Sequence, residues 1–250
     1  YGADNRLCAL RPARFFLAVV RVEQPLAKPD VLRRHLHQFI VVDITDRFFK
    51  LERAGRGQPY RFVRSRRDDF WLALGIERPI VMGCSMGGAV TLGVAARYQE
   101  EITGIIGLES AAFAEGRDNN FLHHPAIHGG ELAACYTYGL NAPSSPEAGC
   151  RENWWYYSQG GPGVYKGDVY FYCEDWDARE EIKSIDTNRC KVSLLTGEYD
   201  YSATPEMSRA AHEAITGSRF TVMEDIGHFP MIEHYDRFRP YLMTELDQML

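Results

Sequence analysis

The sequence predicts an α/β protein in which a mostly parallel central sheet is flanked by helices and carries an inserted segment of helices and loops. Three observations support this fold class. Short apolar runs rich in β-branched residues alternate with helical patterns, as in sheets that are covered on both faces. The alternation is interrupted at 112–187, where Gly, Pro and aromatic residues gather. It then resumes and continues to the end of the 250 residues, a length that can bury a sizeable core.

The predicted strands are short runs of mainly apolar residues, which is typical of strands buried in a parallel sheet. The series begins with "RFFLAVVRV" and "HQFIVVDI", and "KVSLLTG" resumes it after the interruption. We expect strands at 14–22, 37–44, 78–84, 102–109, 191–197 and 219–224.

The predicted helices carry recognisable end signals. Gly75 is a suitable terminator for the first helix, and Pro205 suits the first turn of the third. In the last helix Phe238, Leu242 and Leu246 lie four residues apart, which predicts a buried stripe. We expect helices at 63–74, 86–100, 205–216 and 235–249.

Composition and charge favour an ordinary globular protein over a membrane or nucleic-acid partner. No apolar run approaches the ~20 residues of a membrane helix, and no signal peptide is visible, so we expect a cytoplasmic protein. Residues 1–80 contain 16 Lys and Arg against 9 Asp and Glu, whereas 81–250 contain 12 against 25. The basic residues are scattered without an aromatic stacking pattern, which indicates a solvated surface. We expect a monomer or homodimer that binds a small molecule.

The six cysteines show neither a CxxC pair nor a zinc pattern. Reduced thiols are therefore expected, and one disulfide among Cys135, Cys150 and Cys173 stays open.

The stretch "MGCSMGG" predicts a nucleophilic serine. Ser85 stands in a G-x-S-x-G pattern, where a predicted strand ends and a predicted helix begins. Such a sharp turn requires small residues beside it, and Gly83, Gly87 and Gly88 supply them. The turn places Ser85 at the carboxyl end of the strand, the edge where open parallel sheets bind ligands. The backbone N–H of Met86, at the start of the helix, could hold an oxyanion.

A serine nucleophile needs a base, and the base needs an orienting acid. The sequence offers both in the chain order Ser, Asp, His that is used on this type of sheet. Asp200 follows the predicted strand 191–197, and His228 follows the predicted strand 219–224. Both loops therefore leave the sheet at the same edge as Ser85.

Each of these residues also has a purely structural interpretation. Ser85 could be a turn residue, Asp200 could cap the helix that begins near 205, and His228 could be a packed loop histidine. Because all three occur together in the expected order, we favour the catalytic interpretation. Glu109, which follows the predicted strand after the serine, is an alternative acid.

These stretches resemble the α/β-hydrolase superfamily. The resemblance is carried by "ALGIERPIVMGCSMGGAV", "LLTGEYDYSATPE" and "DIGHFPMIEHYDRF", and it is best over 73–250. It implies a hydrolase core formed by 1–111 and 188–250, with a cap, or lid, at 112–187. It also implies the three roles of a catalytic triad, with Ser85 as nucleophile, Asp200 as acid and His228 as general base.

The first 75 residues fit this family poorly. Relatives usually follow their early strand with a His-Gly loop, whose backbone gives the second oxyanion donor. Here the strand 14–22 is followed by "EQPLAKPD", which has neither residue, although a backbone N–H near Glu23 could still serve. Since the loss of one oxyanion donor costs about 10²–10³ in rate, this departure threatens activity more than the fold.

No metal or other cofactor is predicted. His123, His124 and His128 cluster with Glu131, but their spacing matches no known ligand pattern. The aromatic residues of the cap are expected mainly to pack it onto the sheet, and a few to line an apolar site. The candidate substrate-binding residues are Trp154, Trp155, Tyr157 and His124.

We therefore expect a serine hydrolase that acts on a small or medium, mainly apolar carboxylic ester through an acyl-enzyme. A thioester, a lactone or a carbon–carbon bond beside a ketone would suit the same machinery. The alternative is a binding protein or weakly active pseudo-hydrolase on the same fold, which the missing His-Gly loop favours.

Overall fold

The structure is a computed structural model that describes residues 77–114, 124–126, 130–160 and 164–250, together with the backbone of four earlier strands. Of the predicted helix at 63–74, Val63 is the last residue of a strand, and 64–74 lie outside the described residues. The four early strands are β1 (Leu17–Val20), β2 (Ile40–Val42), β3 (Lys50–Arg53) and β4 (Tyr60–Val63).

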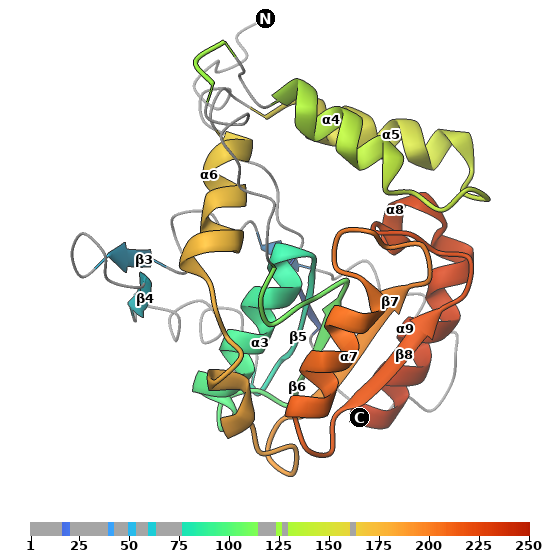
Figure 1. Cartoon of the computed structure of the whole chain (residues 1–250). Helices are drawn as coiled ribbons and strands as arrows, with labels where there is room; N and C mark the ends of the chain where they lie inside the picture. The colour runs from blue at the N-terminus through green and yellow to red at the C-terminus, as the bar shows by residue number, and fades with distance from the viewer. Residues whose placement is uncertain are drawn as a thin grey trace, which may run out of the picture.

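A mixed sheet forms the centre of the described chain, with the strand order β2-β1-β5-β6-β7-β8 (Figure 1). Its last four strands run parallel, and their register aligns Cys84 with Leu108 and Leu108 with Leu195. The carboxyl ends of β5, β6 and β7 therefore meet at one edge. β3 and β4 pair with each other apart from this sheet. The parallel strands are β5 (Ile80–Cys84), β6 (Gly104–Leu108), β7 (Lys191–Gly197) and β8 (Arg219–Met223).

The first two predicted strands exist, but they run antiparallel to their neighbours. Leu17 pairs with Gly83, and Val20 pairs with Ile80, so β1 ends where β5 begins. An apolar run indicates that a segment is a buried strand, but the direction of the strand depends on its pairing. The prediction of a mostly parallel sheet is confirmed, with an antiparallel pair of strands at one side.

Helices cover both faces of the parallel strands. Leu92 and Ile215 pack with Ile105 on one face, while Phe238 packs with Ile106 on the other. Ile105 and Ile106 are adjacent in β6, and neighbouring residues of a strand point to opposite faces. The predicted stripe of Phe238, Leu242 and Leu246 is confirmed as buried. The helices are α3 (Met86–Tyr98) and α7 (Pro205–Ala214) on the first face, and α9 (Tyr235–Met249) on the second.

The segment between β6 and β7 contains helices, as the sequence predicts. Figure 1 shows α4 and α5 side by side beyond the edge of the sheet where β7 ends, close to the short helix α8. We call these two helices the α4–α5 pair. The elements are α4 (Gly130–Gly139), α5 (Glu147–Ser158), α6 (Val164–Tyr170), the π-helical turn η3 (Phe171–Asp175) and the 3₁₀ turn η4 (Glu181–Ser184); α8 is Pro230–Glu233.

The thiols of Cys135, Cys150 and Cys173 are free, so the disulfide left open by the sequence does not form among them. Cys84 and Cys190 are also free, and Cys8 lies outside the described residues. Among the helices of the described chain, none has the length and apolar character that crossing a bilayer requires.

The buried stripe of α9 gives a first prediction. Replacing Phe238 by Ala should lower the free energy of unfolding by about 3–5 kcal/mol, because it leaves a cavity between α9 and the sheet. Urea denaturation measures this loss. The matched control Asp247→Ala changes an exposed residue of the same helix and should stay within about 0.5 kcal/mol of the wild type. Equal losses in both variants would show that the stripe does not anchor the helix.

Candidate active site

A strained turn between β5 and α3 presents Ser85. The backbone of Ser85 adopts φ 58° and ψ −121°, a conformation that residues with side chains rarely adopt. Its N–H donates to the carbonyl of Leu108 at 2.9 Å, which ties the turn to the neighbouring strand. A Cβ atom on Gly83 would lie 2.2 Å from the carbonyl oxygen of Gly87, so the turn requires glycine there. Packing therefore holds Ser85 in a conformation that its own backbone does not favour.

The structure argues against a capping role for Ser85. Its side chain makes no capping hydrogen bond to α3, although it stands immediately before the helix. The N–H of Met86, the first residue of α3, also donates to no acceptor within the described part of the chain. A half-buried hydroxyl and an unused N–H thus lie next to each other at the positive end of a helix.

His228 and Asp200 form a buried hydrogen-bonded pair. Nδ1 of His228 lies 2.7 Å from Oδ2 of Asp200, and both side chains are almost fully buried. Because Nδ1 is used by this bond, Nε2 is the nitrogen left for a further partner. The ring of Phe229 meets the His228 ring edge-on, with the centroids 4.7 Å apart, and restricts its rotation.

Asp200 does not cap α7, although it lies shortly before that helix. Its Oδ1 accepts from the N–H groups of Ser202 at 2.6 Å and Ala203 at 3.1 Å, which closes a turn. The capping role belongs to Thr204, whose hydroxyl accepts from the N–H of Met207. The turn orients the carboxylate so that Oδ2 faces His228.

The loop of His228 lies against the end of β5. The thiol of Cys84 donates to the carbonyl of His228 at 3.4 Å, so the histidine backbone is adjacent to the residue that precedes Ser85. Between the described Ser85 and His228 there is no direct hydrogen bond. In many enzymes the hydrogen bonds of catalytic groups are long or poorly aligned before substrate binds.

Asp200 is held in its charged form. Burial acts to raise its pKa, but the positive charge and hydrogen bond of His228 oppose this, as do hydrogen bonds from Glu109 and the Ser202 N–H. Together they hold the pKa of Asp200 below its ordinary value. An ionised Asp200 is the form that orients a histidine base and stabilises its protonated ring.

Glu109 is a third buried acid at the same place. Its backbone has φ 49°, and its carboxyl oxygens accept from the Gly197 N–H at 2.9 and 3.1 Å. Burial raises its pKa well above the ordinary value, the charge of Asp200 adds to the rise, and its carboxyl group hydrogen bonds Asp200. Because the pKa of Glu109 is raised and that of Asp200 is lowered, Glu109 is the carboxyl group that carries the shared proton and donates this hydrogen bond. The geometry thus makes Asp200, rather than Glu109, the direct partner of His228.

Glu109, Asp200 and His228 each place one possible ligand atom within 4.8 Å of the others. The 2.7 Å between the His228 nitrogen and the Asp200 oxygen is a hydrogen-bond distance. Two ligands that are each about 2.1 Å from a tetrahedral zinc would lie about 3.4 Å apart. The arrangement therefore fits a proton network better than a metal site.

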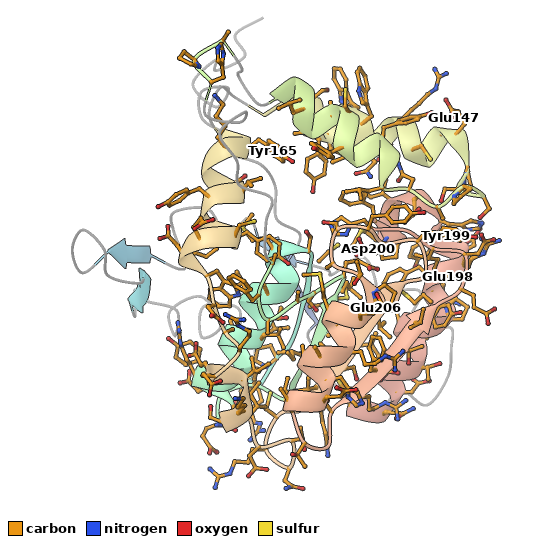
Figure 2. All side chains as sticks on the ribbon, in the orientation of Figure 1. Glu147, Tyr165, Glu198, Tyr199, Asp200 and Glu206 are labelled. Carbon is orange, nitrogen blue, oxygen red and sulfur yellow. The ribbon has the colours of Figure 1, made fainter. Side chains whose placement is uncertain are left out.

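Aromatic residues of the inserted segment approach this network. The Tyr157 ring, on α5, lies 5.4 Å from the ring of Phe229 between centroids. Burial raises the pKa of Tyr157, and the nearby Cys84, Asp168 and Tyr165 contribute to the rise. Burial also raises the pKa of Asp168, on α6, to about 7. Figure 2 shows Tyr165 projecting from α6 on the side of the α4–α5 pair, and Asp200 on the loop after β7 below that pair.

The structure brings only one of the four candidate substrate-binding residues to the network. Tyr157 contacts Phe229, whereas Trp154 and Trp155 are 43% and 58% exposed. On α5, Asn153 and Tyr157 lie one turn apart and face inward, which leaves the intervening tryptophans outward. The three remaining residues stay predictions: Trp154, Trp155 and the exposed His124, whose ring nitrogen accepts from the Ala126 N–H.

The predicted second oxyanion donor, Glu23, lies outside the described residues. The preceding strand ends at Val20, which pairs with Ile80 at the opposite end of β5 from Ser85. His123 and His128 also lie outside the described residues.

Sequence reasoning gave no role to Phe229 and Glu233. Both lie in "GHFPMIEH" close to His228, and both prove to be buried. The available signal was Glu233 itself, an acidic residue within a run of apolar residues. A carboxylate in such a run is expected to have hydrogen-bond partners, because an unpaired carboxylate is rarely buried.

A serine in a strained strand-to-helix turn, at the carboxyl edge of a parallel sheet beside a His–Asp pair, defines a hydrolase-type α/β protein. The chain belongs to the alpha/beta hydrolase fold family, whose model matches residues 58–235. Membership of this family supports hydrolase activity in general terms.

Solved structures agree with this assignment. A thermophilic esterase from Thermogutta terrifontis aligns with a TM-score of 0.61 at 20% identity, over 72% of this chain and 69% of that chain. An enol-lactonase from Burkholderia xenovorans aligns with 0.59 at 21% identity, over 71% and 68%. A bromoperoxidase from Bacillus anthracis aligns with 0.59 at 15% identity, over 72% and 71%. At these identities the likeness shows the fold alone.

The raised pKa of Glu109 predicts a pH-dependent stability difference. Above the ordinary pKa of glutamate, the unfolded chain loses a proton that folded Glu109 retains, so the free energy of unfolding falls as pH rises. Glu109→Gln removes the pH-dependent contribution of this carboxyl group to the free energy of unfolding. The amide still offers a donor to Asp200 and an acceptor to Gly197. The variant should therefore gain stability relative to the wild type as the pH rises above about 5, by at most about 1.4 kcal/mol per pH unit.

Thermal unfolding at several pH values measures this gain. Glu213→Gln, at an exposed position, is the control and should show no such trend. A Glu109→Gln difference that is constant over this range would show that Glu109 is ionised in the folded protein.

Proposed function

We propose that the protein is a serine hydrolase that cleaves a small or medium, mainly apolar carboxylic ester through an acyl-enzyme. His228 Nε2 accepts the Ser85 proton while Ser85 Oγ attacks the carbonyl carbon, and the Met86 N–H holds the resulting oxyanion. The tetrahedral intermediate collapses, and the proton on His228 passes to the leaving alcohol. Water, deprotonated by His228, then releases the acid and restores Ser85.

One observation carries this proposal, namely the 2.7 Å bond between His228 Nδ1 and Asp200 Oδ2 on a loop that contacts the end of β5. The bond fixes the tautomer in which Nε2 can accept a proton. A charged Asp200 stabilises the imidazolium that forms in the reaction. The strained Ser85 turn supplies the nucleophile at the same edge of the sheet.

The surroundings favour neutral, apolar substrates over anionic ones. Tyr157 and Phe229 offer aromatic surface beside His228. The neighbouring side chains include three acidic groups, Asp168, Asp200 and Glu109. None of these three carries a positive charge that would attract an anionic substrate. An esterase and an enol-lactonase are among the structural relatives, so lactones belong in the first substrate panel with simple esters. Thioesters and carbon–carbon bonds beside a ketone complete that panel.

We also propose that the segment 112–187 acts as a cap. The support is the position of the α4–α5 pair beyond the edge of the sheet and the contact of Tyr157 with Phe229 (Figure 1). Through this contact, the segment can determine which acyl or alcohol groups reach Ser85.

A second candidate is a binding protein with the same network and little turnover. It is favoured by the direction of β1, whose last residue, Val20, lies at the opposite end of β5 from Ser85. A site with one oxyanion donor instead of two would lose about 10²–10³ in rate.

Replacing Ser85 by Ala separates the two candidates. With p-nitrophenyl butyrate, the wild type should show burst release of p-nitrophenol and labelling by a fluorophosphonate probe. Ser85→Ala should lose both, with kcat reduced at least about 10⁴-fold, because the nucleophile is absent. Absence of both signals in a folded wild type would favour the binding protein.

The acid partner of His228 can be tested separately. Asp200→Asn should lower kcat by about 10⁴-fold, because the amide favours the wrong histidine tautomer. Glu109→Gln is the matched control, and it should stay within about tenfold of the wild type, because the amide still donates to Asp200. The assignment is wrong if the Glu109 variant proves the more damaging of the two.

A further inference from the structure

Glu233 is a buried carboxylate that the proposed chemistry does not use. It ends α8 and is 1% exposed. Its Oε1 accepts from the N–H groups of Gly227 at 2.8 Å and Phe229 at 3.0 Å. Its Oε2 accepts from the Ala142 N–H and the Ser145 hydroxyl, both at 2.7 Å. All four donors are neutral, and the four bonds occupy the lone pairs of both oxygens.

The two oxygens of this carboxylate accept hydrogen bonds from different segments of the chain. Oε1 holds the two residues that flank His228, while Oε2 holds the connection between α4 and α5. The N–H of His228 itself donates to the carbonyl of Leu140 at 2.9 Å, on the same connection. The three successive N–H groups from 227 to 229 are therefore all bonded, and the backbone that carries the imidazole has no unsatisfied donor.

The two segments are also in steric contact. A Cβ atom on Gly227 would lie 2.3 Å from the carbonyl oxygen of Leu140 and 2.6 Å from the nitrogen of Ala142. The backbones thus touch directly, and the loop of His228 cannot shift toward the α4–α5 pair. Any displacement of that pair instead strains or breaks the bonds to Glu233.

We propose that Glu233 is a positioning residue for His228, and that it makes the orientation of the imidazole depend on how the α4–α5 pair is seated. This inference rests on the proposed function, because it assigns Glu233 a role toward the proposed general base. Tyr157 of α5 packs on Phe229, whose N–H is one of the four donors. A substrate that displaces Tyr157 would therefore also affect Phe229 and its hydrogen bond to Glu233, next to His228 in the chain.

Kinetics and proton NMR of Glu233→Gln test the role of the carboxylate. With p-nitrophenyl butyrate, kcat should fall about 10²-fold with little change in KM, because a displaced base weakens the transition state more than substrate binding. The NMR resonance of the His228 Nδ1 proton, which reports its bond to Asp200, should broaden or shift. Glu233→Asp, which keeps the charge with a shorter reach, should recover part of both signals.

The control is Glu245→Gln, which changes another buried carboxylate, 2% exposed and bonded to Ser193 and Arg219 away from His228. It should lower stability while kcat per folded molecule and the NMR resonance stay at wild-type values. Ser145→Ala removes only one bond from the α4–α5 side and should give a smaller loss of kcat in the same direction. This variant decides the question if Glu233→Gln does not fold.

The NMR signal distinguishes a failure of this inference from a failure of the proposed function. If the wild type neither hydrolyses esters nor reacts with a fluorophosphonate, the proposed function fails, and the His228 resonance still tests Glu233. A folded Glu233→Gln protein with an unchanged resonance would overturn the inference. The same holds if Ser145→Ala leaves both the resonance and kcat unchanged.

Discussion

Parallel pairing of β5, β6, β7 and β8 is the constraint on which the rest of the site depends. In this register, the carboxyl ends of neighbouring strands lie at one edge, so residues far apart in sequence become neighbours. Ser85, Glu109 and Asp200 follow three successive strands of this series, and His228 follows the fourth. The hydrogen bonds between the strands place the loops that carry these four residues at the same edge of the sheet.

Burial then decides how the acids of the site differ. Asp200 has a charged partner and backbone donors, which keep its pKa low despite burial. Burial and the negative charge of Asp200 raise the pKa of Glu109, and its one backbone donor, the Gly197 N–H, only partly opposes them. Glu233 has four neutral donors and no contact with a cation among the described residues. The three neighbouring carboxyl groups thus differ in behaviour because they differ in the hydrogen-bond donors and charges around them.

Much of this could be predicted from sequence, because the signals are local or periodic. The glycines beside Ser85 mark a sharp turn, the spacing of Phe238, Leu242 and Leu246 marks a helix face, and loop positions after strands follow from alternation. The site as predicted contained Ser85, Asp200 and His228, and the structure places all three at one edge.

Other features depend on tertiary contacts and leave no local signal. The direction of β1 is set by its pairing, which an apolar run does not specify. Packing determines which face of α5 points inward. Tyr157 lies on that face, whereas Trp154 and Trp155 do not, and the sequence alone does not show this difference. Glu233 bonds residues up to 91 positions away, so its partners could not be read from its neighbours.

The close approach of the loops after β7 and β8 limits how this protein can diversify. A Cβ atom on Gly197 would lie 2.3 Å from the carbonyl oxygen of Gly227, so the loops that carry the acid and the base touch through bare backbone. Neither loop can lengthen or gain bulk at this point without pushing the other away. If the segment between β6 and β7 acts as the proposed cap, changes in it could alter substrate preference while leaving this contact intact.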